Sequence, residues 1–268
     1  MRVLICITAL VLVAALAAGT AYADSWGQAY IKQIAYGYVG FSSVRADFTY
    51  DDGGGVPGYD GTPSSTYAHW DENYWSDNVY TGQYGFDLDP AKSSWIANKL
   101  LKDPFYAYCT DLVQNPGDWS YYDLRPLEEA PIGGGVGPMG TTKANALREL
   151  FGTVKPGILI GNANHEAFAS CVWEIVYEKP GVAYNLASGW LQVGALTSGS
   201  LAQGWLNGIT WKTSEYDNGV FAITSPGKQD FALTNPDLGG YIPEPVTMAG
   251  LMLGIGSVVG YARRRRTA

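Results

Sequence analysis

The C-terminal segment constrains the fold most, because it separates a membrane-compatible end from the part of the chain that must fold in water. Residues 246–262 carry no charge over 17 positions, and Arg263, Arg264, Arg265 and Arg266 follow directly. As a helix this run would rise roughly 25 Å, near the short limit for a hydrocarbon core of about 30 Å. The arginines should stay on the cytoplasmic side. Everything before this expected transmembrane helix would then lie on the opposite side of the membrane.

Directly before the apolar run stand Pro243, Glu244 and Pro245, and the two prolines disfavour a helix there. Pro-Glu-Pro, a short apolar helix and a terminal arginine block together resemble the PEP-CTERM sorting signal of bacterial surface proteins. The resemblance implies that an exosortase, a membrane enzyme, cuts the chain near Pro-Glu-Pro. The protein would then be released or re-attached outside the cell. An ordinary C-terminal membrane anchor is the alternative.

The N-terminal segment also predicts export. Arg2 precedes an apolar run from Val3 to Ala18, and Ala21 and Ala23 form a small-x-small cleavage site. We therefore expect a signal peptide over residues 1–23, an exported domain over 24–241 and a sorting signal over 242–268. An uncleaved N-terminal anchor is the alternative.

The exported part is strongly acidic. The chain holds 17 basic and 25 acidic residues, and setting aside Arg2, Glu244 and the four tail arginines leaves 12 and 24, a net charge of −12. Such a surface argues against nucleic acid and anionic lipid as partners. Cys6 would leave with the signal peptide, so Cys109 and Cys171 would reach an oxidising compartment.

The pattern of apolar residues predicts a β-rich α+β domain, an antiparallel β-sandwich or barrel with a few packed helices. The expected strands are Tyr38–Tyr50, Val79–Leu88, Phe105–Val113, Val220–Ile223 and Asp230–Leu233. The expected helices are Ser25–Tyr36, Lys143–Phe151, His165–Glu178 and Ser200–Asn207. The helix His165–Glu178 is apolar on most faces, so we expect it to be buried, with Phe168 and Trp173 inside the domain.

Three segments carry a second resemblance: Tyr108-Cys109-Thr110-Asp111-Leu112, the helix around Trp173-Glu174, and Lys228-Gln229-Asp230-Phe231. Together they are similar to the thioester domains of bacterial surface proteins. The resemblance implies that a strand cysteine attacks a glutamine side chain, releases ammonia, and forms a thioester that acylates an amine on a partner surface. It places the cysteine at Cys109 and the glutamine four residues before the helix tryptophan.

At that second position this chain has Ala169, which offers no carboxamide carbon to attack. We therefore expect a degenerate site in which Cys109 forms no thioester with the helix and is a small buried hydrophobe. Gln114, Gln192 and Gln229 remain as acceptors in principle, and their spacing favours none of them. A thioester would form only if the fold brought one of these amides to the Cys109 sulfur.

A disulfide between Cys109 and Cys171 is a further hypothesis for these cysteines. It would close a loop of about 63 residues, worth on the order of 4 kcal/mol in the loop-entropy model. However, two positions along a helix differ by about 200°. If Ala169 faces Cys109, then Cys171 points nearly away from it.

These observations predict an exported cell-surface or matrix protein, processed by an exosortase, with a structural or adhesive role in extracellular polysaccharide. The expected partners are the exosortase, the polysaccharide or another surface protein, and the membrane before processing. We expect no enzyme activity, no cofactor, no metal and no nucleic acid. His69 and His165 lack a matched serine or metal-ligand spacing.

Two alternatives stay open. A glycan-binding module would use aromatic side chains that cluster in segments expected to be loops, namely Trp70, Tyr74, Trp75, Trp119, Tyr121 and Tyr122. A glycoside hydrolase would need two carboxylates about 5–10 Å apart in a cleft.

Overall fold

The computed structural model describes residues 25–49, 69–71, 74–132, 137–179, 182–194, 196–210 and 219–235. For residues 35–49, 69–71, 74–78, 80 and 158 it describes the backbone alone. Apart from Ser25 and Trp26, these residues belong to one unit, Gly27–Gly240. The signal peptide expected at residues 1–23 and the sorting signal with its transmembrane helix expected at residues 242–268 lie outside the described residues. None of the described helices has both the length and the hydropathy needed to cross a membrane.

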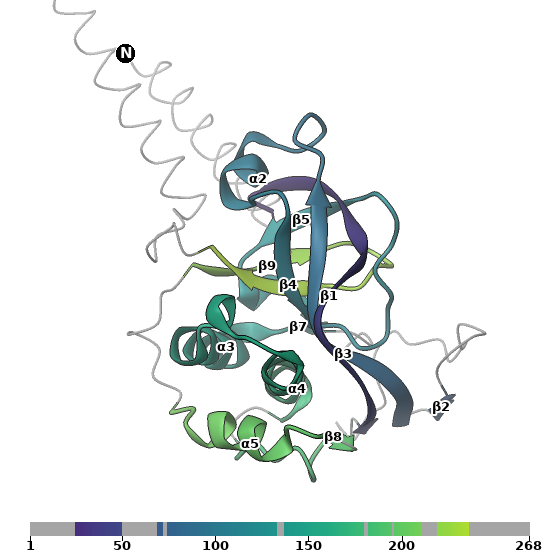
Figure 1. Ribbon diagram of the computed structural model, residues 1–268, viewed down its shortest axis with the longest axis vertical. Coiled ribbons are helices and arrows are strands. Elements are labelled where there is room, and N and C mark those ends of the chain that lie inside the picture. Colours follow the sequence, from purple (N-terminus) through teal and green to yellow (C-terminus); the bar gives the residue numbers. More distant parts are fainter. Residues whose placement is uncertain are drawn as a thin grey trace, which may run out of the picture. The chain divides into compact units, whose positions relative to one another are not determined.

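Within the described residues, six antiparallel strands close into a barrel (Figure 1). In neighbour order they are β3 (Tyr74–Leu88), β4 (Phe105–Cys109), β10 (Phe231–Thr234), β9 (Val220–Thr224), β5 (Ser120–Arg125) and β1 (Gly27–Thr49). Pairing between β1 and β3 closes the ring. The short strands β2 (His69–Asp71) and β8 (Leu191–Gly194) add to β3 and β1. Of the two architectures expected from the sequence, the barrel is confirmed.

The first strand corrects one prediction from the sequence. The helix expected at Ser25–Tyr36 is wrong, because β1 already begins at Gly27. Ala29 and Ile31 are buried, whereas Tyr30 and Lys32 between and after them are partly exposed. This alternation with a period of two is what a strand with one face toward a core produces.

Four helices accompany the barrel in the described part of the chain: α2 (Trp95–Leu100), α3 (Gly140–Val154), α4 (Asn162–Tyr177) and α5 (Gly199–Asn207). Short 3-10 turns occur at Leu127–Glu129 and Pro156–Ile158, and a two-stranded sheet joins β6 (Pro131–Ile132) to β7 (Gly137–Pro138). The three longer helices lie together on one side of the barrel (Figure 1). Their existence was predicted from the sequence and is confirmed.

Helix α4 lies in the middle of this group and contacts β1, β3, β4, β8, α3 and α5. Phe168 and Trp173 are almost completely buried, as predicted, with exposed fractions of 0% and 1%. Phe168 also stacks at an angle on Tyr108 of β4, with ring centroids 4.5 Å apart. A helix that is buried on nearly all of its faces therefore serves as the core between the barrel and the other helices.

Two buried glutamates of α4, and a third directly after the helix, hold the chain that follows. Their carboxylates accept hydrogen bonds from backbone N–H groups at 2.7–2.9 Å. The acceptors are Glu166, Glu174 and Glu178, and the matching donors belong to Thr197, Asn185 and Trp190. Buried carboxylates are tolerated where such bonds replace water, so the loop 182–198 is tied to α4 by polar contacts.

Candidate functional site

A cysteine and a glutamine that are far apart in the sequence meet in a buried site. The side-chain nitrogen of Gln229 donates a hydrogen bond to the Cys109 sulfur, with 3.0 Å between Nε2 and Sγ. The same nitrogen donates to the backbone carbonyl of Asp111 at 3.0 Å, and so does the Cys109 thiol at 3.0 Å. Cys109 is fully buried, and Gln229 is 6% exposed. The Gln229 carbonyl oxygen is buried, with no hydrogen-bond partner among the described residues.

Strand pairing explains how these two side chains meet. Cys109 ends β4 and pairs with Phe231, which begins β10 in the antiparallel direction. The end of one strand therefore lies beside the residues that lead into the other. Two further backbone bonds fix this junction, from Thr110 N–H to Asp230 O at 2.9 Å and from Gln229 N–H to Asn115 O at 3.2 Å.

The environment keeps the Cys109 thiol protonated at rest. Burial raises the pKa of this thiol far above its ordinary value, and the nearby carboxyl of Asp111 raises it further. A hydrogen bond from the backbone of Asp111 and the indole of Trp173 act in the opposite direction. A thiolate is the reactive form of cysteine, so any nucleophilic step at Cys109 needs a group that accepts its proton.

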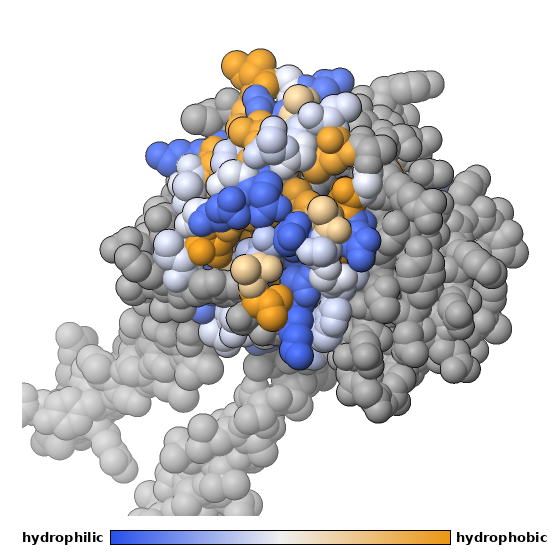
Figure 2. All heavy atoms as spheres, turned by 90° about the horizontal axis from the view of Figure 1, so that it is seen from below, coloured by the Kyte–Doolittle hydropathy of each residue, from blue (hydrophilic) through white to orange (hydrophobic). Residues whose placement is uncertain are grey.

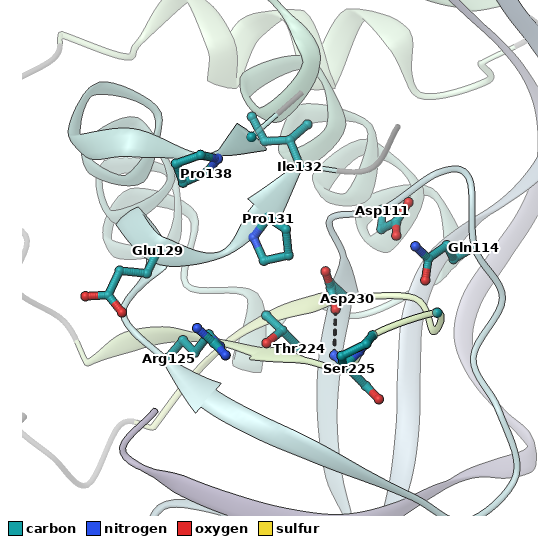
Figure 3. Close-up of a pocket in the computed structure, with 13 residues that line it drawn as sticks. Asp111, Gln114, Arg125, Glu129, Pro131, Ile132, Pro138, Thr224, Ser225 and Asp230 are labelled. Atoms are coloured by element: carbon teal, nitrogen blue, oxygen red, sulfur yellow. Dashed lines mark hydrogen bonds between the residues drawn. The ribbon is translucent and has the colours of Figure 1, made fainter. Parts of the chain in front are cut away.

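Next to this pair is a pocket of about 590 Å³, lined among others by Asp111, Gln114, Arg125, Glu129, Ser225 and Asp230. Figure 3 shows the Asp111 and Asp230 side chains at the pocket, with a dashed line joining Asp230 to Ser225. Burial raises the pKa of Asp111 to about 7 and that of Asp230 to about 8. Hydrogen bonds from the backbone N–H groups of Val113 and Ser225, each at 2.9 Å, oppose these increases.

Helix α4 brings Trp173, rather than a glutamine, to the Cys109 sulfur. Ala169 lies one helical turn before Trp173, on the same face, and is fully buried. The amide that contacts Cys109 comes instead from Gln229, one of the three glutamines that the sequence left open. The Cys109 sulfur therefore has an amide partner even though Ala169 stands where the resemblance places a glutamine.

Both described cysteines are free. The Cys171 thiol donates a hydrogen bond to the backbone carbonyl of Ala202 in α5, at 3.3 Å, and the Cys109 thiol contacts Asp111. The two thiols thus point to different elements, as the helical register of Ala169 and Cys171 predicted. The structure contains no disulfide between Cys109 and Cys171.

The aromatic residues proposed for glycan binding form no open platform among the side chains that the structure describes. Tyr122 is buried, and for Trp70, Tyr74 and Trp75 the structure describes the backbone alone. Trp119 and Tyr121 are exposed on or beside β5. The expectation that these aromatic residues lie in loops is wrong for five of them, because Tyr121 and Tyr122 lie in β5, Trp70 in β2, and Tyr74 and Trp75 in β3. Trp119 stacks on Tyr30, with ring centroids 5.3 Å apart. Lys32 lies over the ring of Trp119, and Lys92 lies over the ring of Tyr30. Neighbouring side chains thus compete with a sugar for these rings.

The histidines do not form a hydrolytic site in the described residues. His165 is buried in α4, where its Nδ1 is 2.8 Å from the Tyr108 hydroxyl, and His69 is described by its backbone alone. No group of three or more His, Cys, Asp or Glu side chains in the described ranges is arranged to hold a metal ion.

Several predicted site residues lie outside the described residues. These are the sorting residues Pro243, Glu244, Pro245, Arg263, Arg264, Arg265 and Arg266, and the signal-cleavage residues Ala21 and Ala23. Two further residues of the site, Asp111 and Asp230, could not be singled out from the sequence, because their chemistry depends on their burial. The signal that could have found Gln229 is its place directly before the last strand, because an antiparallel partner of the cysteine strand must start near Cys109.

No family model matches the chain, and no curated protein or solved structure matches it.

Proposed function

We propose that this chain is an exported cell-surface or extracellular-matrix protein whose barrel domain forms an internal thioester between Cys109 and Gln229. The thioester then attaches the protein covalently to a nucleophile on a neighbouring surface. One observation carries this proposal: the Gln229 amide nitrogen lies 3.0 Å from the Cys109 sulfur in a buried site. The proposal replaces the expectation of a degenerate site, which rested on Ala169.

The chemistry of the bond is balanced without an oxidant or a cofactor. The Cys109 sulfur attacks the side-chain carbonyl carbon of Gln229, so that an S–C bond forms and the C–N bond breaks. The thiol proton leaves with the amide nitrogen as ammonia. An amine that later attacks the same carbon forms an amide, and the sulfur leaves and becomes a thiol again.

The surroundings of Gln229 support this reaction over a purely structural contact. Among the described residues no donor holds the Gln229 carbonyl oxygen, so the carbonyl can change its geometry when the sulfur attacks its carbon. Burial also excludes bulk water, which would hydrolyse a thioester. The Cys–Gln pair therefore sits where an acyl bond can persist until a nucleophile enters the adjoining pocket.

The setting outside the cell is part of the same proposal. The resemblance to a PEP-CTERM signal supports exosortase processing, membrane insertion by residues 246–262 before cleavage, and a final place in the extracellular polysaccharide layer. A strongly acidic exported domain supports partners other than nucleic acid.

The hydrolase alternative has weaker support than the thioester. Asp111 and Asp230 line one pocket, as a glycoside hydrolase would require of its two carboxyls. Both carboxyls are almost completely buried beside the Cys109–Gln229 pair. Glycoside hydrolysis has no use for such a cysteine–glutamine pair. The carboxyls are better explained by the chemistry of that pair.

Intact-mass measurement of the exported domain tests the proposal. Wild-type protein should weigh ~17 Da less than the linear sequence, through loss of ammonia, and should take up methylamine. Gln229→Ala should abolish both signatures. Gln114→Ala is the matched control, because Gln114 lines the pocket beside the pair and the amide that contacts the sulfur belongs to Gln229, so this variant should retain both. Full linear mass in folded wild-type protein, with no methylamine uptake, would reject the thioester.

A further inference from the structure

Closing and opening a thioester both require proton transfer. The Cys109 thiol must lose a proton before it attacks, and the amide nitrogen must gain one to leave as ammonia. The sulfur is fully buried, and burial raises the pKa of the thiol, so spontaneous ionisation contributes little. The site therefore needs nearby groups that exchange protons near neutral pH.

Two carboxyls meet this requirement by position. Asp111 and Asp230 are 1% and 4% exposed, and both line the pocket beside the Cys–Gln pair (Figure 3). The backbone carbonyl of Asp111 accepts hydrogen bonds from both reacting side chains, and Asp230 follows Gln229 directly in the chain. Both carboxyls act electrostatically on the Cys109 thiol.

Hydrogen bonds hold the two carboxyls in place, and a nearby arginine offsets only part of their negative charge. Backbone N–H groups of Val113 and Ser225 each donate to one of their oxygens. Asp111 raises the pKa of Asp230 by charge repulsion, and Arg125 on β5 lowers it. Tyr177 of α4 also faces this group, since Asp111 and Asp230 raise the pKa of its hydroxyl after burial. Like charges held together favour a state in which one carboxyl keeps a proton.

We propose that the carboxyls of Asp111 and Asp230 accept and donate the protons of the thioester reaction. This inference rests on the proposed Cys109–Gln229 thioester and deepens it. In bond formation, an ionised carboxyl accepts the thiol proton while the sulfur attacks the Gln229 carbon. A protonated carboxyl then delivers a proton to the departing nitrogen, which leaves as ammonia.

The same groups serve the opening reaction in reverse. An incoming primary amine attacks the acyl carbon and becomes positively charged at nitrogen. An ionised carboxyl accepts the proton of this nitrogen, and a protonated carboxyl returns one to the departing Cys109 sulfur. The carboxyls are unchanged at the end, and the products are an amide at Gln229 and a free thiol.

Matched variants separate this role from the acidity of the pocket. Asp230→Asn and Asp111→Asn keep the shape of the side chain and an oxygen that can accept the backbone N–H. Glu129→Gln removes the same charge from the pocket at an exposed position, and no interaction of Glu129 with Cys109 is described. After refolding, the appearance of the ~17 Da loss and the rate of methylamine uptake are followed by intact mass.

We expect Asp230→Asn and Asp111→Asn to slow one or both steps on the order of 100-fold, the usual scale of acid–base assistance. Glu129→Gln should behave as wild type. If wild-type protein forms the thioester and both asparagine variants match its rates, the inference fails and the proposed function stands. If wild-type protein shows no mass loss, the proposed function itself fails.

A second measurement decides the case if an asparagine variant does not fold. The rate of methylamine uptake by wild-type protein, divided by the concentration of unprotonated methylamine, is measured against pH. The inference requires this quotient to pass through a maximum between pH values of about 7 and about 8, where Asp111 and Asp230 titrate, because the reaction uses one ionised and one protonated carboxyl. A quotient that stays constant across this range overturns the inference.

Discussion

The indole of Trp173 lies against the Cys109 sulfur, where it opposes the increase in thiol pKa caused by burial and by Asp111. Its N–H group is buried, and no acceptor among the described residues lies at hydrogen-bonding geometry to it. Trp173 is also among the largest fully buried side chains described. One side chain thus fills the core between α4 and the barrel and presents a donor to the sulfur.

Substitution of Trp173 should separate these two roles. Trp173→Ala should lower the free energy of unfolding by about 3–5 kcal/mol, because a large buried side chain is lost and a cavity remains. Trp173→Phe keeps most of the apolar volume but removes the N–H, so it should cost less stability. Urea unfolding measures both. Equal stability of wild type and Trp173→Ala would contradict the central place of this helix.

Local pattern was enough to predict the elements that build the site. The aromatic alternation before Cys109 predicted strand β4, and the apolar run that ends near Glu178 predicted helix α4. The observed ends of both elements lie within a few residues of the predicted ones. Their long periodic runs leave little choice of structure. The contact between Cys109 and Gln229 could not be predicted in this way, because it depends on which strands pair and in what register.

Two other differences have the same physical origin. The segment from Gly27 is a strand because β5 and β3 pair with it, although its first residues also suit a helix. Asp111 and Asp230 fall within expected strands, and the sequence did not show that both are buried, which raises their pKa values. Neither burial nor pairing partner is a local property of the sequence.

Buried acids should make the domain less stable as the pH rises. Burial raises the pKa of Glu174 from 4.5 to about 8, and Glu178 adds to this increase. Between these pH values the folded state keeps a proton that the unfolded state has lost, so unfolding becomes easier as pH rises. Glu174→Gln should reduce this slope by about 1.4 kcal/mol per pH unit at most.

Urea unfolding at several pH values measures the slope for wild type and Glu174→Gln. Asp111 and Asp230 remain in both proteins, so their contributions cancel in the comparison. His165 acts in the opposite direction below pH 6.5, because burial lowers its pKa, and it is also common to both proteins. Identical slopes in the two proteins would show that Glu174 is not neutral in the folded domain.

The chain ends should be absent from the mature protein. We expect protein recovered from cells to lack Met1–Ala23 and most or all of Val246–Ala268, because both segments resemble removable signals. Changing Arg263, Arg264, Arg265 and Arg266 to alanine should impair retention and processing, since these charges hold the C-terminus inside. Intact mass reports both cleavages. A full-length tail in the mature pool would instead indicate a plain membrane anchor.

Position 169 gives the sharpest test of which residue supplies the acyl group. Ala169 is fully buried on α4, so a glutamine there must displace neighbouring side chains, at a cost of about 1–3 kcal/mol. We expect Ala169→Gln, placed in a Gln229→Ala background, not to regain methylamine uptake. Ala169→Gln alone should be less stable than wild type but keep the thioester, provided by Gln229. If the double variant regains both the ~17 Da loss and the methylamine uptake, a glutamine at position 169 can supply the acyl group. Gln229 is then not required for the thioester.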